Sequence, residues 1–431
     1  MERQPFHKTK LGRRFRTAAL FEELGPGLVT GAADDDPSGI ATYSQAGAQF
    51  GFGLLWTMIL TYPLMSAVQL VSAHIGRVTG AGLAKSLGET LPEWLVTLLV
   101  ALLFIANTIN IGADLSAMGA SAELVVGGGR HFFLFGFALL SLLLQLFIPY
   151  RRYAKVLKWL TLSLFAYVGV LLTVKVDWTA ALTGMVVPRL FGAPSIVTVV
   201  ALFGTTISPY LFFWQSAQEA EEVATRKSWH PLRIAPRGAM RQFRRMRIDT
   251  LGGMAFSNLI SLAIMIATAA TLHAKGITNI TTASEAAEAL RPVAGQFAFL
   301  LFAVGIIGTG LLAVPVLAGS TAFAISESRG WKSGLEYKPR EAIGFYSVIG
   351  LAMVIGMAVD WSSLDPIKAL FWSAVINGVA AVPIMAAMMV VVSRHKVMGR
   401  FTGSGPLLLF GWIATAVMAA AAIAMFASIG G

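Results

Sequence analysis

Residues 25–51 form an apolar run with charge at its centre, and they read GPGLVTGAADDDPSGIATYSQAGAQFG. The run is long enough to cross a bilayer as a helix. Three consecutive aspartates at 34–36 fall in its middle, where a carboxylate costs about 3 kcal/mol on insertion scales. Pro37 removes a backbone donor and disfavours helical geometry at the preceding residue, and Gly39 allows unusual dihedrals. We therefore predict a membrane helix broken into two halves, with the unwound backbone buried in protein or lining a wet cavity.

The whole chain has the composition of a membrane protein. Of its 431 residues, 56% are hydrophobic and only 13% are charged, and the mean hydropathy is +0.70. A soluble domain carries about 25% charged residues, so this chain lacks the charge to cover a water-facing surface of its length. The composition excludes a soluble enzyme, a disordered chain and a nucleic-acid binder, despite a net charge of +11. The absence of cysteine excludes disulfides, thiolate metal sites and cysteine nucleophiles.

Apolar runs long enough to cross a bilayer recur along the chain. We predict an all-α polytopic membrane protein with about eleven transmembrane helices, of which the third and eighth are long enough to tilt or to extend past the membrane. The basic N-terminus is followed by no cleavage site, so we expect no signal peptide. The predicted spans are 26–49, 52–76, 94–122, 132–149, 156–174, 195–218, 250–272, 296–325, 342–360, 366–392 and 406–428.

Basic residues alternate between the two sides of this arrangement. If the basic N-terminus, residues 1–23, is cytoplasmic, 27 of the 33 Lys and Arg residues fall in inside segments and 6 in outside segments. The positive-inside rule predicts this asymmetry, and the compact loops suit a bacterial inner membrane. The basic loop 219–249 is interpreted as a topology determinant, with binding of anionic lipid head groups as the alternative. Glu219, Glu221 and Glu222 at its start are expected to pair with nearby arginines.

A second polar interruption lies in the sixth span, where residues 196–222 read IVTVVALFGTTISPYLFFWQSAQEAEE. Its segment 204–210 contains small and hydroxyl residues and its own proline. The second break lies five spans after the first. Because five is an odd number, the repeats 24–175 and 190–392 have opposite orientations in the membrane and can form an inverted repeat. The span 406–428 is appended to them. Interrupted helices at matching positions of two such halves are the best sequence pointer to the substrate site of a transporter.

Oxygen atoms dominate both interruptions. Carboxylates, hydroxyls and freed backbone carbonyls are ligands for hard cations such as Mg²⁺, Ca²⁺ or Mn²⁺. Asp36, beside the proline, is the first candidate ligand and Asp35 the second, because three consecutive side chains cannot all face one ion. Asp34 or Asp35 would otherwise face an aqueous vestibule or a helix N-terminus. The six histidines fall in loops or near span ends, which argues against a buried histidine metal site.

The third span and the second half of the sixth span carry further polar side chains. Asp114 is the only other acid well inside the membrane; it either relays protons or draws in a cation, or it is a structural carboxylate. Asn107 and Asn110 either extend a polar path from it or form interhelical hydrogen bonds. Tyr210 and Gln215 follow the second break and carry similar alternatives, as path residues or as an interfacial tyrosine and an interhelical amide.

The motifs at these positions resemble those of the NRAMP divalent-metal transporters, which share the inverted-repeat leucine-transporter fold. The family carries Asp-Pro-Gly-Asn followed by ATxxQAGAxFG; here residues 36–39 are DPSG, followed by ATYSQAGAQFG. The family's Met-Pro-His in the sixth span is SPY at 208–210, and its Asp-Leu-Ala-Glu in the third span is DLSA at 114–117. The similarity covers most of the chain.

The resemblance implies a metal site at the junction of the two breaks. Asp36 stands at the position of the metal-binding aspartate, and Thr205 at that of the residue whose backbone carbonyl binds the ion. Gly39 replaces the family's asparagine ligand and Ser208 its methionine. A thioether favours softer transition metals, so its loss makes the chain resemble the NRAMP-related magnesium transporters.

The resemblance also bears on proton coupling. Tyr210 and Gln215 replace two histidines, the first of which is linked to proton handling in the family. Asp114 keeps an acid implicated in proton transport, but Ala117 replaces the glutamate that accompanies it. The loss of both imidazoles weakens the case for strict proton coupling.

We therefore expect a secondary-type transporter that moves Mg²⁺ or Mn²⁺ by alternating access, with the ion as substrate, no cofactor, no enzymatic activity and no obligatory protein partner. The alternatives are a proton-coupled Mn²⁺/Fe²⁺ importer and a Na⁺-coupled carrier of a small organic solute. A membrane glycosyltransferase would need a water-facing catalytic domain, and a channel a repeated filter loop; the sequence predicts neither. The candidate metal-site residues are Asp36, Gly39, Thr205, Ser208, Asp35 and Tyr210, and the candidate ion-path residues are Asp114, Gln215 and Asn110.

Overall fold

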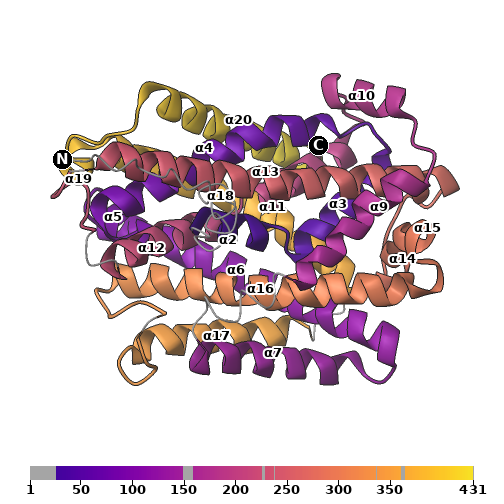
Figure 1. Cartoon of the computed structure of the whole chain (residues 1–431), viewed down its shortest axis with the longest axis horizontal. Helices are drawn as coiled ribbons and strands as arrows, with labels where there is room; N and C mark the ends of the chain where they lie inside the picture. Colours follow the sequence, from indigo (N-terminus) through magenta and orange to yellow (C-terminus); the bar gives the residue numbers. More distant parts are fainter. Residues whose placement is uncertain are drawn as a thin grey trace, which may run out of the picture.

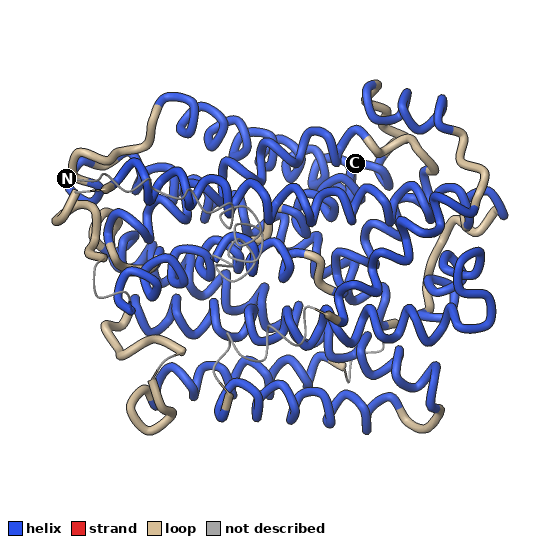
Figure 2. The backbone as a smooth tube through the Cα atoms, viewed as in Figure 1, coloured by secondary structure: helices blue, strands red, loops and turns tan. Residues whose placement is uncertain are grey.

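The chain forms a bundle of long helices (Figure 1). The computed structural model describes residues 26–148, 159–225, 229–236, 238–335, 337–360 and 365–430. Every regular element within these ranges is a helix. Most helices run along the long axis of the bundle, and most loops lie at its two ends (Figure 2). The predicted basic N-terminus, 1–23, lies outside the described residues.

The first five predicted spans correspond to helices of the described chain. The fifth predicted span begins at 156, so its first three residues lie outside the described residues. The helices, with the short α5 after the second span, are α2 (Pro26–Asp34), α3 (Pro37–Phe50), α4 (Trp56–Thr79), α5 (Leu83–Gly88), α6 (Glu93–Val126), α7 (Arg130–Phe147), η1 (Leu160–Leu164) and α9 (Phe165–Thr173).

The remaining six predicted spans also correspond to helices. These are α11 (Ala193–Thr206) with α12 (Pro209–Thr225), then α13 (Ala239–Thr271), α16 (Ala298–Ser328), α17 (Ile343–Val359), α18 (Pro366–Ser393) and α20 (Gly405–Gly430). Shorter helices join them: α10 (Trp178–Val186), η2 (His273–Lys275), α14 (Ala283–Ala287), η3 (Glu288–Leu290), α15 (Arg291–Ala294), η4 (Gly295–Phe297) and α19 (His395–Met398). Among the described residues, eight helical segments are long and apolar enough to cross a membrane, and two shorter apolar helices accompany them.

The helix that contains the seventh predicted span begins earlier than the span itself. The helix α13 begins at Ala239, well before the predicted residue 250. The basic stretch 219–249 is therefore not one loop, since α12 extends to Thr225 and α13 includes the end of the stretch. Hydropathy marks the edge of the bilayer, whereas a helix continues into water as long as its backbone bonds are kept.

Both predicted breaks are present, and each has a local cause. Asp36 has extended backbone angles (φ −74°, ψ 170°) and caps α3, whose first residue is Pro37. The second break follows the same pattern, because α11 ends at Thr206 and Pro209 begins α12. Proline fits the first turn of a helix, where its missing N–H has no partner in any case.

Glycines allow the broken helices to approach their neighbours closely. The half-helix α2 packs against α13, and a Cβ at Gly31 would lie 2.4 Å from the backbone of Gly253. In the second half, α11 packs against α18, and a Cβ at Gly204 would lie 2.0 Å from the carbonyl oxygen of Ala374. No side chain fits at either contact. These contacts help to hold the two breaks near the middle of the bundle (Figure 1).

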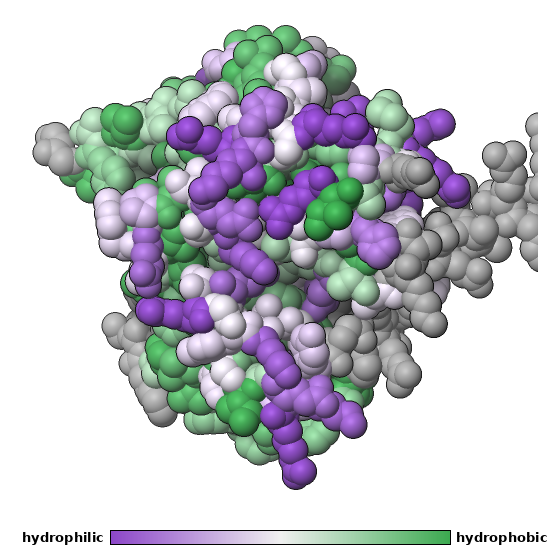
Figure 3. Space-filling view, turned by 90° about the vertical axis from the view of Figure 1, so that its left-hand side faces the viewer, coloured by the Kyte–Doolittle hydropathy of each residue, from purple (hydrophilic) through white to green (hydrophobic). Residues whose placement is uncertain are grey.

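One end of the bundle is strongly hydrophilic. Figure 3 shows polar side chains spread across the face at the end where α5, α12 and α19 lie in Figure 1. Exposed basic residues on the segments there include Arg233, Arg244 and Lys332. We call this face the basic end. The orientation rule predicts that it is cytoplasmic.

Candidate cation site at the two helix breaks

The first break is organised around the carboxylate of Asp36, which is buried. Its Oδ1 accepts hydrogen bonds from the hydroxyl of Ser38 and the backbone N–H of Gly39, both at 2.7 Å. Its Oδ2 accepts one from the Asn110 amide nitrogen at 3.1 Å. The local sequence explains the first two bonds, because an aspartate before Pro37 is well placed to cap the helix that follows.

The second break presents its oxygen atoms toward the first. The Ser208 hydroxyl lies 2.7 Å from the Gly204 carbonyl and 2.9 Å from the Thr205 carbonyl, in the last turn of α11. The Thr205 hydroxyl is buried without a hydrogen-bond partner. A Cβ at Gly39 would lie only 3.1 Å from that hydroxyl oxygen. The two breaks therefore meet at Gly39, and its lack of a side chain allows their approach.

The polar face of α6 borders this junction. Asn110 donates to Asp36, and its own amide oxygen has no donor. Asp114, one turn further along, is fully buried, and neither of its carboxylate oxygens has a hydrogen-bond partner. Asn107, one turn earlier, donates to the Leu317 carbonyl at 3.2 Å and lies close to two hydroxyls of α16. Asn110 and Asp114 thus face the junction, whereas Asn107 forms the interhelical bond given as its alternative.

Tyr210 and Gln215 link α12 to α2, nearer the basic end. The Tyr210 hydroxyl donates to the Ala33 carbonyl at 3.1 Å, where α2 is about to end. The Thr30 hydroxyl lies 2.5 Å from the amide oxygen of Gln215, whose nitrogen lies 3.3 Å from Glu219. Gln215 therefore forms the interhelical amide contact given as its alternative, whereas Tyr210 is fully buried and bonds to α2, so it is not an interfacial tyrosine. Tyr210 lies next to the first break, and Gln215 lies further from it.

The three consecutive aspartates divide between two directions. Asp36 faces α6 and α11, whereas Asp34 and Asp35 face α13, where both approach the hydroxyl of Ser257 at 2.6 and 3.0 Å. The sequence analysis did not identify Ser257 or Ser261. Their four-residue spacing was the available signal, because it places two hydroxyls on one face of the helix.

The junction offers oxygen ligands of several kinds for a cation. They are the carboxylates of Asp36 and Asp114, the amide oxygen of Asn110, and the hydroxyl of Thr205. Among the described residues, no three His, Cys, Asp or Glu side chains are grouped so as to hold a metal ion. No described Lys or Arg pairs with either carboxylate. An all-oxygen set with few carboxylates suits a hard cation that keeps part of its water shell.

A network of ion pairs joins the helices at the basic end. Arg77 of α4 bonds to Glu219 and, at 2.6 Å, to Glu222, and all three side chains are buried. Arg245 of α13 pairs with Glu222 at 3.0 Å. The ring of Trp229 lies 4.5 Å from the Arg77 guanidinium. The predicted pairing with arginines is therefore confirmed for Glu219 and Glu222.

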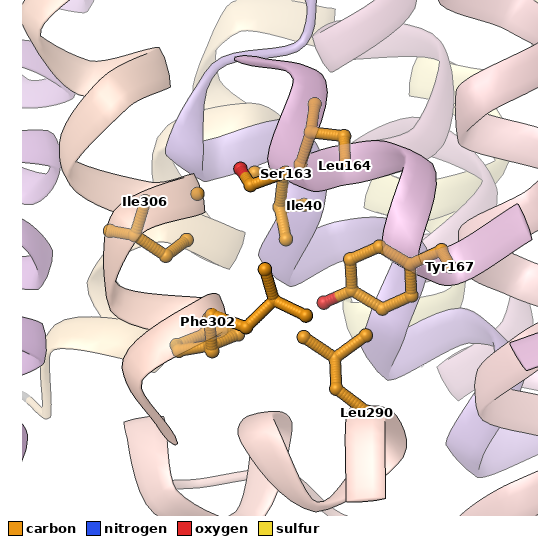
Figure 4. A pocket seen from close by; sticks show the side chains of 9 residues that line it. Ile40, Ser163, Leu164, Tyr167, Leu290, Phe302 and Ile306 are labelled. Atoms are coloured by element: carbon orange, nitrogen blue, oxygen red, sulfur yellow. The ribbon is translucent and has the colours of Figure 1, made fainter. Parts of the chain in front are cut away.

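A small cavity lies beside α3, within one helical turn of Asp36. Figure 4 shows the Tyr167 side chain between those of Ile40 and Leu290 at this cavity. Most of its other lining residues are apolar, among them Phe302 and Ile306. Asp36 itself is only 1% exposed, so the junction is shielded from the surroundings in this conformation.

The chain matches one protein family over nearly its whole length. The family model described as "Natural resistance-associated macrophage protein-like" (Nramp) matches residues 27–428. The divalent metal cation transporter MntH of Burkholderia ambifaria is 26% identical over 422 residues, covering 94% of this chain and 89% of that protein. The MntH protein of Deinococcus radiodurans is 25% identical over 409 residues, covering 92% and 87%.

Solved structures show the same fold. The manganese transporter of Eremococcus coleocola aligns with a TM-score of 0.72 at 16% identity, covering 98% of this chain and 89% of that one. Mhp1, a nucleobase-cation-symport-1 family transporter, aligns with a TM-score of 0.57 at 12% identity, covering 94% and 93%. These alignments confirm the predicted all-α membrane fold, a 5+5 inverted repeat of the leucine-transporter type with discontinuous first and sixth helices. With the family match, they identify the chain as a multi-pass integral membrane protein that belongs to the Nramp family.

Proposed function

We propose that this protein moves a divalent cation across the membrane by alternating access, with the ion bound between the two helix breaks. The observation that carries the proposal is the junction itself, where Asp36, Asn110 and Thr205 bring oxygen atoms from three elements to one buried place. Curated relatives are named divalent metal cation transporters, and a structural neighbour is a manganese transporter. Asp35 is a weaker candidate ligand here, because it faces α13 instead.

We further propose that the preferred ions are hard, Mg²⁺ and Mn²⁺. Gly39 and Ser208 stand where the family motif places an asparagine and a methionine, so the site offers neither an amide nor a thioether from these positions. Oxygen ligands suit Mg²⁺, which dehydrates reluctantly and usually keeps several waters. Tyr210 and Gln215 replace imidazoles, which supports transport without strict proton coupling. The proton-coupled Mn²⁺/Fe²⁺ importer is the alternative.

The location of the protein is part of the same proposal. We place it in a bacterial inner membrane with its N-terminus and basic end in the cytoplasm, supported by the 27 to 6 division of Lys and Arg. We assign 24–175 and 190–392 to the two repeats and 406–428 to the appended helix. The ion is the substrate, and the proposal needs neither a cofactor nor a partner protein.

Uptake into proteoliposomes tests the proposed function. Mg²⁺, Mn²⁺ and Ca²⁺ are offered separately while internal pH is recorded, with Asp36→Ala as the inactive variant and Asp365→Ala as the matched control. Asp365 is an exposed cap of α18 that pairs with Lys368. We expect Mg²⁺ and Mn²⁺ entry without acidification, lost in Asp36→Ala and kept in Asp365→Ala.

Two other results would change the assignment. Mn²⁺ entry with acidification and exclusion of Mg²⁺ would establish the proton-coupled alternative. An absence of flux for every divalent ion would refute the metal proposal and favour the Na⁺-coupled carrier of a small organic solute.

A further inference from the structure

The geometry points to a second cation site on the opposite side of the first break, made by Asp34, Asp35 and Tyr43 of the broken helix and by Ser257 and Ser261 of α13. Its ligand is a hard divalent cation. The inference relies on the proposed function only for the class of ion. It differs from the junction site, because the carboxylates of Asp34 and Asp35 face α13 while that of Asp36 faces α6. The ring of Tyr43 borders Gly39 and so adjoins the junction as well.

The two carboxylates have too few hydrogen-bond donors around them for their oxygen atoms. The Ser257 hydroxyl lies 2.6 Å from Asp34 Oδ2 and 3.0 Å from Asp35 Oδ1, but a hydroxyl has one proton and donates to one of them. The Ser261 hydroxyl lies 3.0 Å from the Ser257 carbonyl and 3.5 Å from Asp35 Oδ1. Its proton therefore goes to the backbone, and both serine oxygens keep lone pairs directed to the cluster.

Three more oxygen atoms of the cluster are buried and have no hydrogen-bond partner in the part of the chain that the structure describes. They are Asp34 Oδ1, Asp35 Oδ2 and the hydroxyl of Tyr43. Tyr43 is fully buried, and its hydroxyl lies toward the side chain of Ser261. Buried polar atoms in proteins nearly always have partners, so each orphaned oxygen requires an explanation. One cation among these atoms would explain all three.

Among the described residues, no positive side chain balances the two carboxylates. Within the described residues, neither Asp34 nor Asp35 has an ion pair, and Arg77 of the neighbouring α4 is engaged by Glu219 and Glu222. On α13, Arg247 precedes Ser257 by ten residues, which is about 15 Å along a helix. Buried charges without a counterion cost several kcal/mol each. A divalent ion matches the charge of two carboxylates, and the surrounding hydroxyls complete an all-oxygen shell.

A second ion at this place would also connect the two halves of the broken helix to α13. Its ligands come from the end of α2, from α3 and from α13, so binding holds the break against the seventh span. The junction site holds the same break against the third and sixth spans. Occupancy of the two sites together determines how firmly the first span is fixed.

Counting bound ions tests the inference. The purified full-length protein is dialysed to equilibrium against Mn²⁺ in Na⁺-free buffer, and bound Mn²⁺ is measured by elemental analysis. We expect two ions per chain in the wild type, one in the isosteric double variant Asp34→Asn/Asp35→Asn, and one in Asp36→Asn. We expect Ser257→Ala to weaken one of the two binding events about tenfold, the usual effect of removing a group that orients a ligand.

The control and the contrary outcomes are as follows. Thr268→Val removes another buried hydroxyl of α13, one that bonds only to its own helix, and should keep two ions. A wild type with one ion, retained in the Asp34→Asn/Asp35→Asn variant, would overturn the second site and assign protons to these carboxylates. An unchanged ion count in Asp36→Asn would instead refute the junction site, so the two failures are distinguishable. Should the double variant be unstable, the affinity change in Ser257→Ala alone decides, since an unchanged affinity would refute the site.

Discussion

Asp36 caps α3 and is also the proposed cation ligand, and both roles use the same carboxylate. Its Oδ1 caps α3 through Ser38 and Gly39, and its Oδ2 is held by Asn110. A cation bound to Asp36 would share the two carboxylate oxygens with three hydrogen-bond donors, and would therefore interact with only part of the negative charge of the carboxylate. A site with a divided carboxylate binds less tightly than a dedicated cage. Such moderate affinity suits an ion that must be released on the other side, and it leaves waters on a reluctantly dehydrated ion such as Mg²⁺.

At the residue scale, we predict that Gly39→Ala weakens divalent-ion binding about tenfold. The new Cβ would lie 3.1 Å from both the Thr205 hydroxyl and the Tyr43 ring, so one of these side chains must shift. Overpacking of this kind costs about 1–3 kcal/mol, and about 1.4 kcal/mol corresponds to tenfold. Isothermal titration with Mg²⁺ measures the change. Gly136→Ala in α7 is the control, because its Cβ would meet nothing within 4 Å; equal affinities for the two variants would contradict the prediction.

At the scale of helices, the basic end is closed by buried ion pairs that bring α4, α12 and α13 together. Arg77 bonds to two glutamates that are one turn apart on α12, and Arg245 adds α13 to the pair. The positive charge of the buried arginine balances the negative charge of these acids, whose burial without a counterion would cost free energy. The network therefore fixes the position of the second half of the sixth span relative to the second and seventh spans.

We predict that Arg77→Met lowers the stability of the folded protein by about 3 kcal/mol, because it removes the arginine that Glu219 pairs with and one of the two arginines that Glu222 pairs with. Thermal unfolding in detergent measures the effect as a large fall in Tm. Arg233→Met is the matched control, since its pair with Glu89 is about one-third exposed on each side, and such pairs contribute about 0–1 kcal/mol. A similar Tm for both variants would show that the buried network does not stabilise this conformation.

The half-helix α2 gives a second prediction at this scale. The Tyr210 hydroxyl bonds to the Ala33 carbonyl, and the bond contributes about 1 kcal/mol. Tyr210→Phe removes only this bond. In a background of Ala32→Cys, we expect the rate of modification by a soluble maleimide to rise about fivefold, because α2 separates from α12 more often. The chain has no cysteine of its own, so the introduced thiol is the only target. An unchanged rate would mean that the bond does not hold α2 in place.

At the scale of the whole molecule, the orientation of the bundle can be tested directly. We predict that Lys275→Cys, at the end opposite the basic end, is labelled by a membrane-impermeant maleimide on intact cells. Arg400→Cys, at the basic end, should be labelled only after the cells are opened. Both positions are exposed in the structure. The reverse pattern would place the basic end outside and overturn the assignment from loop charge.

The architecture could be predicted because its signals are local. A proline beside buried charge marks a break wherever it lies, and long apolar runs mark spans. The division of the three aspartates could not be predicted, because it depends on which neighbouring helix presents Ser257. The early start of α13 was missed for a different reason, since hydropathy detects the bilayer and not the helix. Gly39 was identified by family resemblance, but its contact with Thr205 exists only once two distant segments are packed together.

In the proposed alternating-access cycle, the bonds that hold α2 would limit how often the protein opens. Gly27 bonds to Asp249, Thr30 to Gln215, and Ala33 to Tyr210. If each contributes about 1 kcal/mol, these three bonds alone hold α2 by about 3 kcal/mol, so at most about one molecule in 150 has it free at any moment. In such a carrier, α2 is bound to its neighbours nearly all the time. Its turnover is then set by the rarity of opening, so a cargo ion speeds the cycle only if it binds the opened form more tightly than the closed one.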